Sequence, residues 1–509
     1  MQAVILIHGI GEQIPMETLD GFVEAVWTKD HALKNDRPRH LPPGTKPNPD
    51  NLSWAKPDNV SRSFELRRVT TESSKAWRNT DFFEFYWAHM ISGTTLGQVR
   101  HWFLRLMMRN PFKNVPKSVL MAWAALWLVP VGFLVYYLFT IFGPVTAEAE
   151  PSRWTKYAGL GTLITGAAAA FLSKVLVSKI GDVTRYVDPY PANIATRQKI
   201  REQGIKLLES LHDAQDDNGE YVYDRIVIVG HSLGTIIGYD ILTHAFGRMN
   251  GDFQEFQSDG KPAEIGPQTA RAVLEEMVET AIAANTDLDI DAFQAQQAKA
   301  LTELQGQGHV WRVSDFITLG SPLTHAEFLL AKDKADLQTK KEKRLYPTCP
   351  PVLEYDNKFK GFSFTYGNTG LTEKYKSKLK AEGILVKDMD TYFDDRAAPR
   401  QPHHAALFGY TRWSNLYSPV QNILWGDQIS GPLKAAFGLQ AKPSQTLSGI
   451  RDIAVMPERD ADGHPVKGTK PPFMAHVKYW TMQLSKKDTG ANTPYHIQML
   501  RDVLNLDGG

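Results

Sequence analysis

The chain has 509 residues, a length that allows about two to four domains or one large α/β domain with insertions. Apolar residues make up 42% and charged residues 22%, which excludes wholesale disorder. The 57 basic and 56 acidic residues leave a formal net charge of +1, which argues against a dedicated nucleic-acid binder. The single cysteine, Cys349, excludes an intramolecular disulfide and a cysteine-based metal site.

The N-terminal region reads as the beginning of a soluble α/β unit. Residues 3–7 are apolar and are followed by His-Gly, so they predict a buried strand rather than a secretory signal, which would need a basic start and a longer apolar run. Residues 15–27 predict a helix, and residues 31–60 predict a long loop rich in Pro, Asn and Asp. Residues 63–70 and 81–87 predict two further strands.

Two apolar runs interrupt this pattern. Residues 119–142 are almost entirely apolar, and a helix that crosses a bilayer core needs about 20 such residues. Residues 157–177 are rich in Ala, Gly and Leu and contain one charged residue, Lys174. The runs predict two transmembrane helices, with a buried hairpin of a soluble protein as the alternative.

The charges that flank the runs predict an orientation. Basic residues without an intervening acid precede the first run: Arg100, Arg105, Arg109, Lys113 and Lys117. The positive-inside rule then places both outer flanks in the cytosol and residues 143–156 outside, so we expect an inner (cytoplasmic) membrane protein whose soluble part faces the cytosol. Residues 96–112 fit an amphipathic helix on the membrane surface and fit an ordinary soluble helix equally well.

After the second run, strands alternate with helices again. The predicted strands are residues 225–229, 315–319, 412–417 and 449–455, and the predicted helices are 195–211 and 269–305, the latter with a break near 285–289. Residues 331–410 are charged, Pro-rich and irregular, and are interpreted as a cap or insertion over a site. This alternation predicts a mostly parallel sheet covered on both faces, with its functional groups at the carboxyl ends of the strands.

The sequence Gly230-His231-Ser232-Leu233-Gly234 matches the G-x-S-x-G nucleophile elbow. A predicted strand enters this turn, and a predicted helix over residues 235–242 leaves it. In such an elbow the serine is strained, and side chains at both glycine positions would collide with neighbouring backbone. We therefore expect Ser232 to be a nucleophile, and the alternative is an ordinary glycine-rich turn.

A nucleophilic serine also needs donors for an oxyanion. The first expected donor is the backbone N–H of Leu233, because it follows the nucleophile. The second is expected from the loop that follows the first strand, from Ile10 or Gly11. His8, in the same loop, is interpreted as an anchor of the loop by hydrogen bonding rather than as a catalytic group.

With these motifs the chain resembles the α/β-hydrolase superfamily, and within it the lipase-like, membrane-associated serine hydrolases of bacteria. The resemblance rests on VILIHGIGEQ at the start, IVIVGHSLGTIIGYDIL in the middle, DFITLGSPL at 315–323, RWSNLYSP…GDQISGPL at 412–433 and AHVKYW at 475–480. It implies an α/β-hydrolase fold with a mostly parallel sheet, plus an inserted two-helix hairpin that soluble lipases lack. The implied units are a catalytic domain in three parts (1–97, 181–330 and 411–509), a membrane hairpin insertion (98–180) and a cap or irregular insertion (331–410).

The family order of serine, acid and histidine places the base late in the chain. His476 is the candidate base, and the alternatives are His464, His403, His404 and His496. Asp427 is the candidate acid because it follows the predicted strand 412–417, and the alternatives are Asp315, Asp394 and Asp395.

The resemblance implies that Ser232, His476 and Asp427 hydrolyse carboxylic esters, in particular lipid acyl esters, through an acyl-enzyme. It implies no metal and no cofactor, and its expected partners are a lipid or ester substrate and a membrane, but no nucleic acid. The oligomeric state stays open. The alternatives are a secreted lipase toxin that acts on target membranes and a non-catalytic membrane protein on a hydrolase scaffold.

Overall fold

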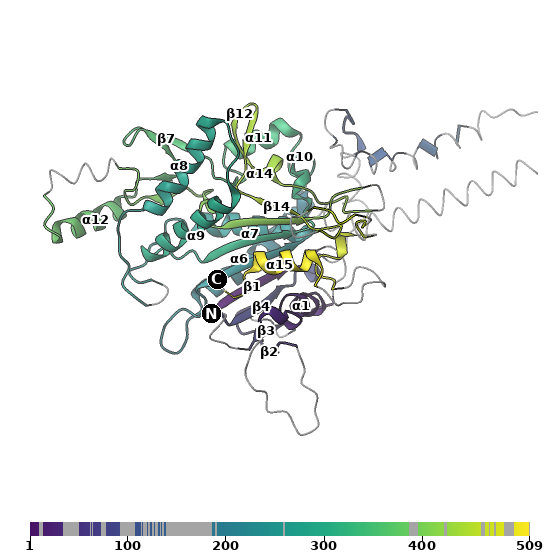
Figure 1. Ribbon diagram of the computed structural model, residues 1–509, viewed down its shortest axis with the longest axis horizontal. Helices are drawn as coiled ribbons and strands as arrows, with labels where there is room; N and C mark the ends of the chain where they lie inside the picture. The colour runs from purple at the N-terminus through teal and green to yellow at the C-terminus, as the bar shows by residue number, and fades with distance from the viewer. Residues whose placement is uncertain are drawn as a thin grey trace, which may run out of the picture.

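An eight-stranded β-sheet forms the centre of the protein (Figure 1), with the strand order β14-β11-β6-β5-β1-β4-β3-β2. The computed structural model describes residues 1–9, 14–33, 50–61, 63, 65–72, 78–91, 107–112, 115, separate positions between 120 and 138, 186–188, 191–257, 260–385, 395–421, 425–459, 464–467, 469–472, 475–482 and 493–507. The strands of the sheet are β1 (Gln2–Ile7), β2 (Ser53–Pro57), β3 (Arg67–Thr71), β4 (Thr80–Phe85), β5 (Arg225–His231), β6 (Val313–Leu319), β11 (Arg412–Tyr417) and β14 (Arg451–Ala454).

The sheet is mostly parallel, as the alternation of strands and helices predicts. Strands β14, β11, β6, β5, β1 and β4 pair in parallel, whereas β3 is antiparallel to β4 and β2 is antiparallel to β3. A parallel sheet must bury both of its faces, and β1 and β5 are buried at every position. The α/β class predicted from the sequence is therefore confirmed.

Helices cover both faces of this sheet (Figure 1). One face carries α6 (Pro191–Asp213), α7 (Leu233–Met249), α8 (Thr269–Ala284) and α9 (Ile290–Gly306), and the other carries α1 (Glu17–Val23) and α15 (Tyr495–Leu504). Successive strand residues point to opposite faces, so Ile5 and Ile7 enter the core under α7 while Val4 and Leu6 enter the core under α1.

Several elements differ from the sequence predictions. The first helix continues beyond α1 as a π-helix over Glu24–Thr28, and β2 lies inside the predicted loop 31–60. The smaller elements are α10 (Ala326–Leu329), α14 (Lys434–Phe437), the hairpin β12 (Leu439–Lys442) with β13 (Gln445–Leu447), and short 3₁₀ turns at His31–Leu33, Ala88–Met90, Pro322–His325, Leu407–Gly409 and Ala475–Val477. These pieces are too short to produce a readable apolar period.

The segment 331–410 is more regular than predicted. It contains α11 (Lys334–Glu342), α12 (Thr369–Ala381), the hairpin β7 (Glu354–Asp356) with β8 (Gly361–Ser363), and the pair β9 (Thr365–Tyr366) with β10 (Gln401–Pro402). Its irregular interpretation was wrong because most of α11 and α12 is polar and faces solvent, which hides the helical period. The hydroxyl of Ser363 donates to Glu275 of α8 at 2.6 Å, so part of the segment is fastened to α8.

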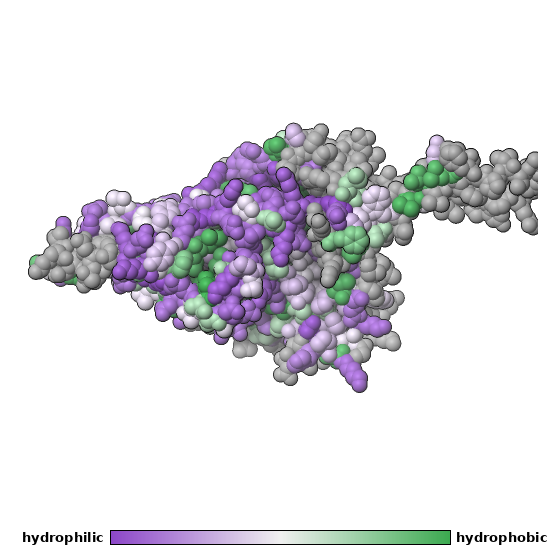
Figure 2. Space-filling view, turned by 90° about the horizontal axis from the view of Figure 1, so that it is seen from above, coloured by the Kyte–Doolittle hydropathy of each residue, from purple (hydrophilic) through white to green (hydrophobic). Residues whose placement is uncertain are grey.

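The predicted membrane spans fall largely outside the described residues. Residues 157–177 lie outside them altogether, and residues 119–142 are described only at separate positions, each of which is helical. Within the part of the chain that the structure describes, no helix is both long and apolar enough to cross a bilayer. The large apolar side chains that are described near the end of the first run are exposed (Figure 2): Val131, Leu134, Tyr137 and Leu138. The hairpin and its orientation stay predictions.

Candidate active site

The turn between β5 and α7 holds Ser232 in a strained conformation. Its backbone angles are φ 53° and ψ −126°, which an L-residue adopts only where the surroundings force it. A Cβ at Gly234 would lie 2.1 Å from the carbonyl oxygen of Ile7, and one at Gly230 would lie 2.7 Å from the Cα of Thr235. Both contacts are with backbone atoms, so glycine is required on each side of the serine, as predicted.

Ser232, His476 and Asp427 form a continuous hydrogen-bonded chain. The Nε2 atom of His476 lies 2.8 Å from the Oγ of Ser232, and its Nδ1 lies 3.0 Å and 3.1 Å from the two carboxylate oxygens of Asp427. Ser232 follows β5, Asp427 lies in the loop after β11, and His476 lies in the 3₁₀ turn Ala475–Val477. The structure thus brings together the three side chains selected from the sequence, in what we call the Ser–His–Asp cluster.

The carboxylate of Asp427 is buried and held on several sides. Burial alone would raise its pKa, but the neighbouring His476 and the hydroxyls of Ser430 and Tyr479 outweigh burial and lower the pKa to about 2. The backbone N–H of Ile429 also donates to Oδ1 at 2.9 Å. An ionised and fixed carboxylate at this place orients the imidazole and favours a proton on its Nδ1.

Tyr479 is a further side chain of the Ser–His–Asp cluster, which the sequence motifs did not indicate. Its buried hydroxyl donates to Oδ2 of Asp427 at 2.8 Å, accepts the backbone N–H of Ser418 at 3.0 Å and lies 3.0 Å from the Oγ of Ser430. Tyr479 lies two residues beyond the turn Ala475–Val477, and no sequence motif signals its contact with Asp427. Gly320, with φ 60°, leaves room for this ring, since a Cβ there would lie 2.7 Å from it.

His231 supports the other side of the cluster. Its Nε2 lies 2.7 Å from the carbonyl oxygen of His476, and because a carbonyl only accepts, this nitrogen carries the proton and donates. The His231 ring also stands edge-on to Trp480, with ring centroids 4.9 Å apart. Burial, and then the nearby His476, lower the pKa of His231 to about 3, so the ring is neutral and can hold the turn that carries His476.

One of the expected oxyanion donors lies in the described residues. Leu233 begins α7, and the N–H groups of the first helical turn have no intrahelical acceptor, so this donor is available beside Ser232. The other candidates, Ile10 and Gly11, lie outside the described residues. Their neighbour Gly9 adjoins the serine, since a Cβ at Gly9 would lie 2.9 Å from the Cβ of Ser232.

His8 has the contacts of an anchor for this loop. Its Nδ1 donates to the carbonyl oxygen of Gly9 at 2.8 Å, and its ring stacks on Trp87 with centroids 5.0 Å apart. The indole of Trp87 in turn donates to the carbonyl oxygen of His8 at 3.0 Å. These contacts fix the end of β1 against β4, next to the serine.

The alternative acids and bases bond to other groups. Asp315 is buried at the amino-terminal end of the sheet, where it pairs with Arg225 at 2.7 Å and Arg412 at 2.8 Å. His403 and His496 are within hydrogen-bond distance of the carbonyl oxygens of Val352 and Thr481. Asp395 accepts the N–H of Ala397, His404 is exposed, and Asp394 lies outside the described residues.

Comparisons with protein-family models, with curated proteins and with solved structures found no match to this chain. In the described residues, no group of three or more His, Cys, Asp or Glu side chains is arranged to hold a metal ion.

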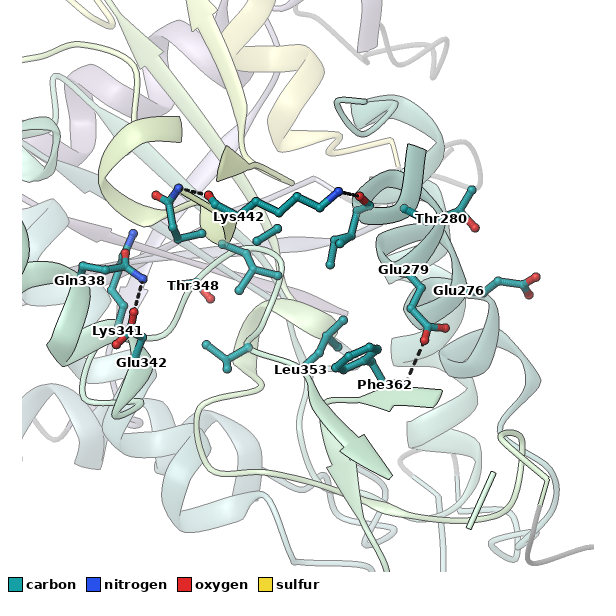
Figure 3. Close-up of a pocket in the computed structure, with 16 residues that line it drawn as sticks. Glu276, Glu279, Thr280, Gln338, Lys341, Glu342, Thr348, Leu353, Phe362 and Lys442 are labelled. Carbon is teal, nitrogen blue, oxygen red and sulfur yellow. Dashed lines mark hydrogen bonds between the residues drawn. The ribbon is translucent and has the colours of Figure 1, made fainter. Parts of the chain in front are cut away.

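A cavity of about 640 Å³ lies apart from the cluster, between α8, α11 and β12 (Figure 3). None of its lining residues belongs to the Ser–His–Asp cluster. Its two lysines already bond to carbonyl oxygens, Lys341 to Gly438 at 3.0 Å and Lys442 to Ile282 at 2.6 Å. Three glutamates, Glu276, Glu279 and Glu342, share the wall with them, so the charges of this cavity are nearly balanced.

Proposed function

We propose that this protein is a serine hydrolase of the α/β-hydrolase type that cleaves carboxylic esters, with lipid acyl esters as its substrates. One observation carries the proposal: a strained serine at the carboxyl end of a central parallel strand is hydrogen-bonded to a histidine that is in turn bonded to a buried, ionised aspartate. Nucleophilic catalysis by serine needs this order of groups, because the hydroxyl is a weak nucleophile until a base removes its proton.

The proposed reaction proceeds in two halves. His476 removes the proton of Ser232 as Oγ attacks the ester carbonyl, and the backbone N–H of Leu233 donates to the oxyanion that forms. The protonated imidazole, stabilised by Asp427, then gives its proton to the departing alcohol, which leaves an ester of Ser232. Water, activated by the same imidazole, hydrolyses this acyl-enzyme and restores the free serine.

The preference for lipid esters rests on the apolar runs. The large apolar side chains described between 131 and 138 are exposed, and an exposed apolar run is typical of a surface that meets a membrane. A membrane-bound hydrolase meets its acyl-lipid substrates at the interface. We therefore include in the proposal attachment to the inner membrane through residues 119–142 and 157–177, with the hydrolase facing the cytosol.

Activity-based labelling tests the catalytic part of the proposal. A fluorophosphonate probe is expected to label the full-length protein at Ser232, and the Ser232→Ala and His476→Gln variants are expected to lose the label. His404→Gln is the matched control because His404 is exposed and its loss leaves the cluster intact. Failure of the folded wild-type protein to react would contradict the proposal, as would equal labelling of the Ser232→Ala variant.

A substrate panel tests the lipid part. Wild-type and Ser232→Ala proteins would be compared on a water-soluble short-chain ester and on vesicles of phosphatidylethanolamine and phosphatidylglycerol, with free fatty acid as the product measured. Release of fatty acid from the vesicles by the wild type alone supports a lipid esterase. Hydrolysis confined to the soluble ester would contradict the lipid preference while leaving the serine hydrolase assignment in place.

A further inference from the structure

A second cavity, of about 770 Å³, runs along the face of α7 that carries Ile236, Tyr239 and Asp240. Its walls come from α6, α7, the chain around residues 329–332 and residues 108–110. Ile236 lies one helical turn beyond Ser232, so one end of this cavity approaches the Ser–His–Asp cluster along the helix. Residues 108–110 precede the first apolar run, so the cavity also adjoins the segment that leads toward the proposed membrane anchor.

The wall of this cavity carries a large excess of positive charge. Its basic residues are Arg109, Arg197, Arg201, Lys332 and Lys340, and its only acidic residue in the described part of the chain is Asp240. The guanidinium of Arg201 lies 2.5 Å from Asp240 and neutralises it. The wall therefore keeps four positive charges that no acid of the wall offsets.

Some of these cations are held by protein groups, and others are not. Lys340 pairs with Asp336 at 2.9 Å, and Arg109 donates to the carbonyl oxygens of Glu327 and Ala331. Arg197, by contrast, has no hydrogen bond or salt bridge to any residue that the structure describes, although it is half-buried next to Arg201. Burial and then the charge of Arg201 lower its pKa, yet a guanidinium keeps its proton at such a site.

A half-buried guanidinium that makes no hydrogen bond to the described residues is costly, because hydrogen bonds do not compensate the desolvation of its charge. An anion in the cavity would remove that cost. A single carboxylate would offset one charge, whereas a phosphate monoester brings a charge of about −1.5 to −2 and three acceptor oxygens, which match a guanidinium and nearby lysines. The cavity of Figure 3 lacks this property because its lysines are bonded and its acids outnumber them.

The same wall also offers apolar surface. Ile236, Leu329, Leu330 and Leu345 line it together with the tyrosines at 186, 239 and 346. We propose that this cavity binds a phosphate ester attached to an apolar chain, with the phosphate at Arg197 and Lys332 and the chain along Ile236 and the leucines. This inference goes beyond the proposed hydrolysis, because it assigns a binding site that does not require Ser232 to react.

Binding measurements on the full-length Ser232→Ala protein test the proposal without turnover. The probes are octyl phosphate, glycerol 3-phosphate, which lacks the chain, and octyl glucoside, which lacks the phosphate. Octyl phosphate is expected to bind about tenfold or more tightly than either of the others in isothermal titration calorimetry. Equal binding of octyl glucoside would overturn the phosphate site, and equal binding of glycerol 3-phosphate would overturn the role of the apolar chain.

Variants locate the binding. Arg197→Ala and Lys332→Ala, added separately to the Ser232→Ala background, are each expected to weaken octyl phosphate binding, by about tenfold for Arg197. Lys199→Ala is the matched control, because it removes the same charge from the same helix but does not line the cavity. An unchanged melting temperature would show that the variants fold. If Arg197→Ala does not fold, Lys332→Ala still tests the site, because Lys332 is exposed and its replacement does not disturb the core. Equal binding by wild-type and cavity variants, or an equal loss in the control, would overturn the proposal.

Discussion

The hydroxyl of Tyr479 donates a 2.8 Å hydrogen bond to Oδ2 of Asp427, the oxygen that lies 3.0 Å from Nδ1 of His476. The same hydroxyl accepts the backbone N–H of Ser418, in the chain that leaves β11. Tyr479 therefore ties the turn that carries the base to the loop that carries the acid. We expect the orientation of the Asp427 carboxylate toward the His476 imidazole to depend on these hydrogen bonds.

Replacement of Tyr479 by phenylalanine removes the hydroxyl that bonds to Asp427 and Ser418 and keeps the aromatic ring. We expect kcat toward a soluble ester to fall by about tenfold or more, because a buried hydrogen bond to a charged group is lost, while KM changes little. Steady-state kinetics on a 4-nitrophenyl ester measure both. Tyr366→Phe removes the hydroxyl of an exposed tyrosine that accepts a hydrogen bond from Gln401, away from the Ser–His–Asp cluster, and serves as the control. An unchanged kcat for Tyr479→Phe would contradict a positioning role.

Two of the buried aspartates, Asp427 and Asp315, are expected to behave differently when each is replaced by asparagine. Asp427→Asn should lower kcat by about three to four orders of magnitude, since the amide no longer favours the productive tautomer of His476. Asp315→Asn should leave the labelling of Ser232 intact but reduce the free energy of unfolding by about 3–5 kcal/mol, because it leaves Arg225 and Arg412 with an uncharged partner. Kinetics and chemical denaturation of both variants check the contrast, and similar losses of kcat in both would refute it.

The glycines at 234 and 238 provide a test of the elbow. A Cβ at position 234 would meet the backbone of Ile7 and His8, which cannot move without distorting β1, so Gly234→Ala is expected to prevent soluble expression. A Cβ at position 238 would lie 3.1 Å from the side chain of Phe316 and 3.3 Å from that of Ile7, so it would crowd side chains rather than backbone. Gly238→Ala should therefore fold with a lowered melting temperature. Normal expression and fluorophosphonate labelling of Gly234→Ala would contradict the steric requirement for glycine at position 234.

Glu84 predicts a pH dependence of stability. It is buried on β4, its Oε2 accepts the backbone N–H of Met16 at 2.7 Å, and burial raises its pKa from 4.5 to about 7. Between these two values the folded state holds a proton that the unfolded state has lost, so the free energy of unfolding falls as the pH rises through this window. The decrease is about 3 kcal/mol for this group.

Glu84→Gln removes that dependence while keeping an acceptor for the N–H of Met16. Melting temperatures measured from pH 4.5 to pH 8 should decline with pH more steeply for the wild type than for the variant. Asp20, whose charge adds to the effect of burial on the pKa of Glu84, remains in both proteins. Parallel curves for the two proteins would rule out this role of Glu84.

The central strands and the elbow were predictable because their signals are strong. Strand β11 matches its predicted bounds, and the break between α8 and α9 falls where it was expected. Parallel strands are buried on both faces and read as short β-branched runs between turns. Strand β2 was missed because it is an edge strand that is exposed at most of its positions, so it carries no buried apolar run.

The candidate site was predictable only in part. Chain order and the position after β11 were enough to select His476 and Asp427, because strands of one parallel sheet end at the same rim. The roles of Tyr479 and His231 were not predictable, because they depend on contacts across 52 and 245 residues of sequence. The charged cavity was not predictable either, because Arg197 and Lys332 are far apart in the sequence and line the same cavity only in the folded chain.

The separation of 244 residues between Ser232 and His476 has a consequence for the newly made protein. Chains fold from the N-terminus during synthesis, so β1 and the elbow can be in place while the ribosome has yet to add the turn at 475–477. Until the chain is long enough to include that turn, Ser232 has no histidine within hydrogen-bond distance of its Oγ in the arrangement that the structure shows. The proposed hydrolytic activity therefore requires synthesis of nearly the whole chain before it can begin.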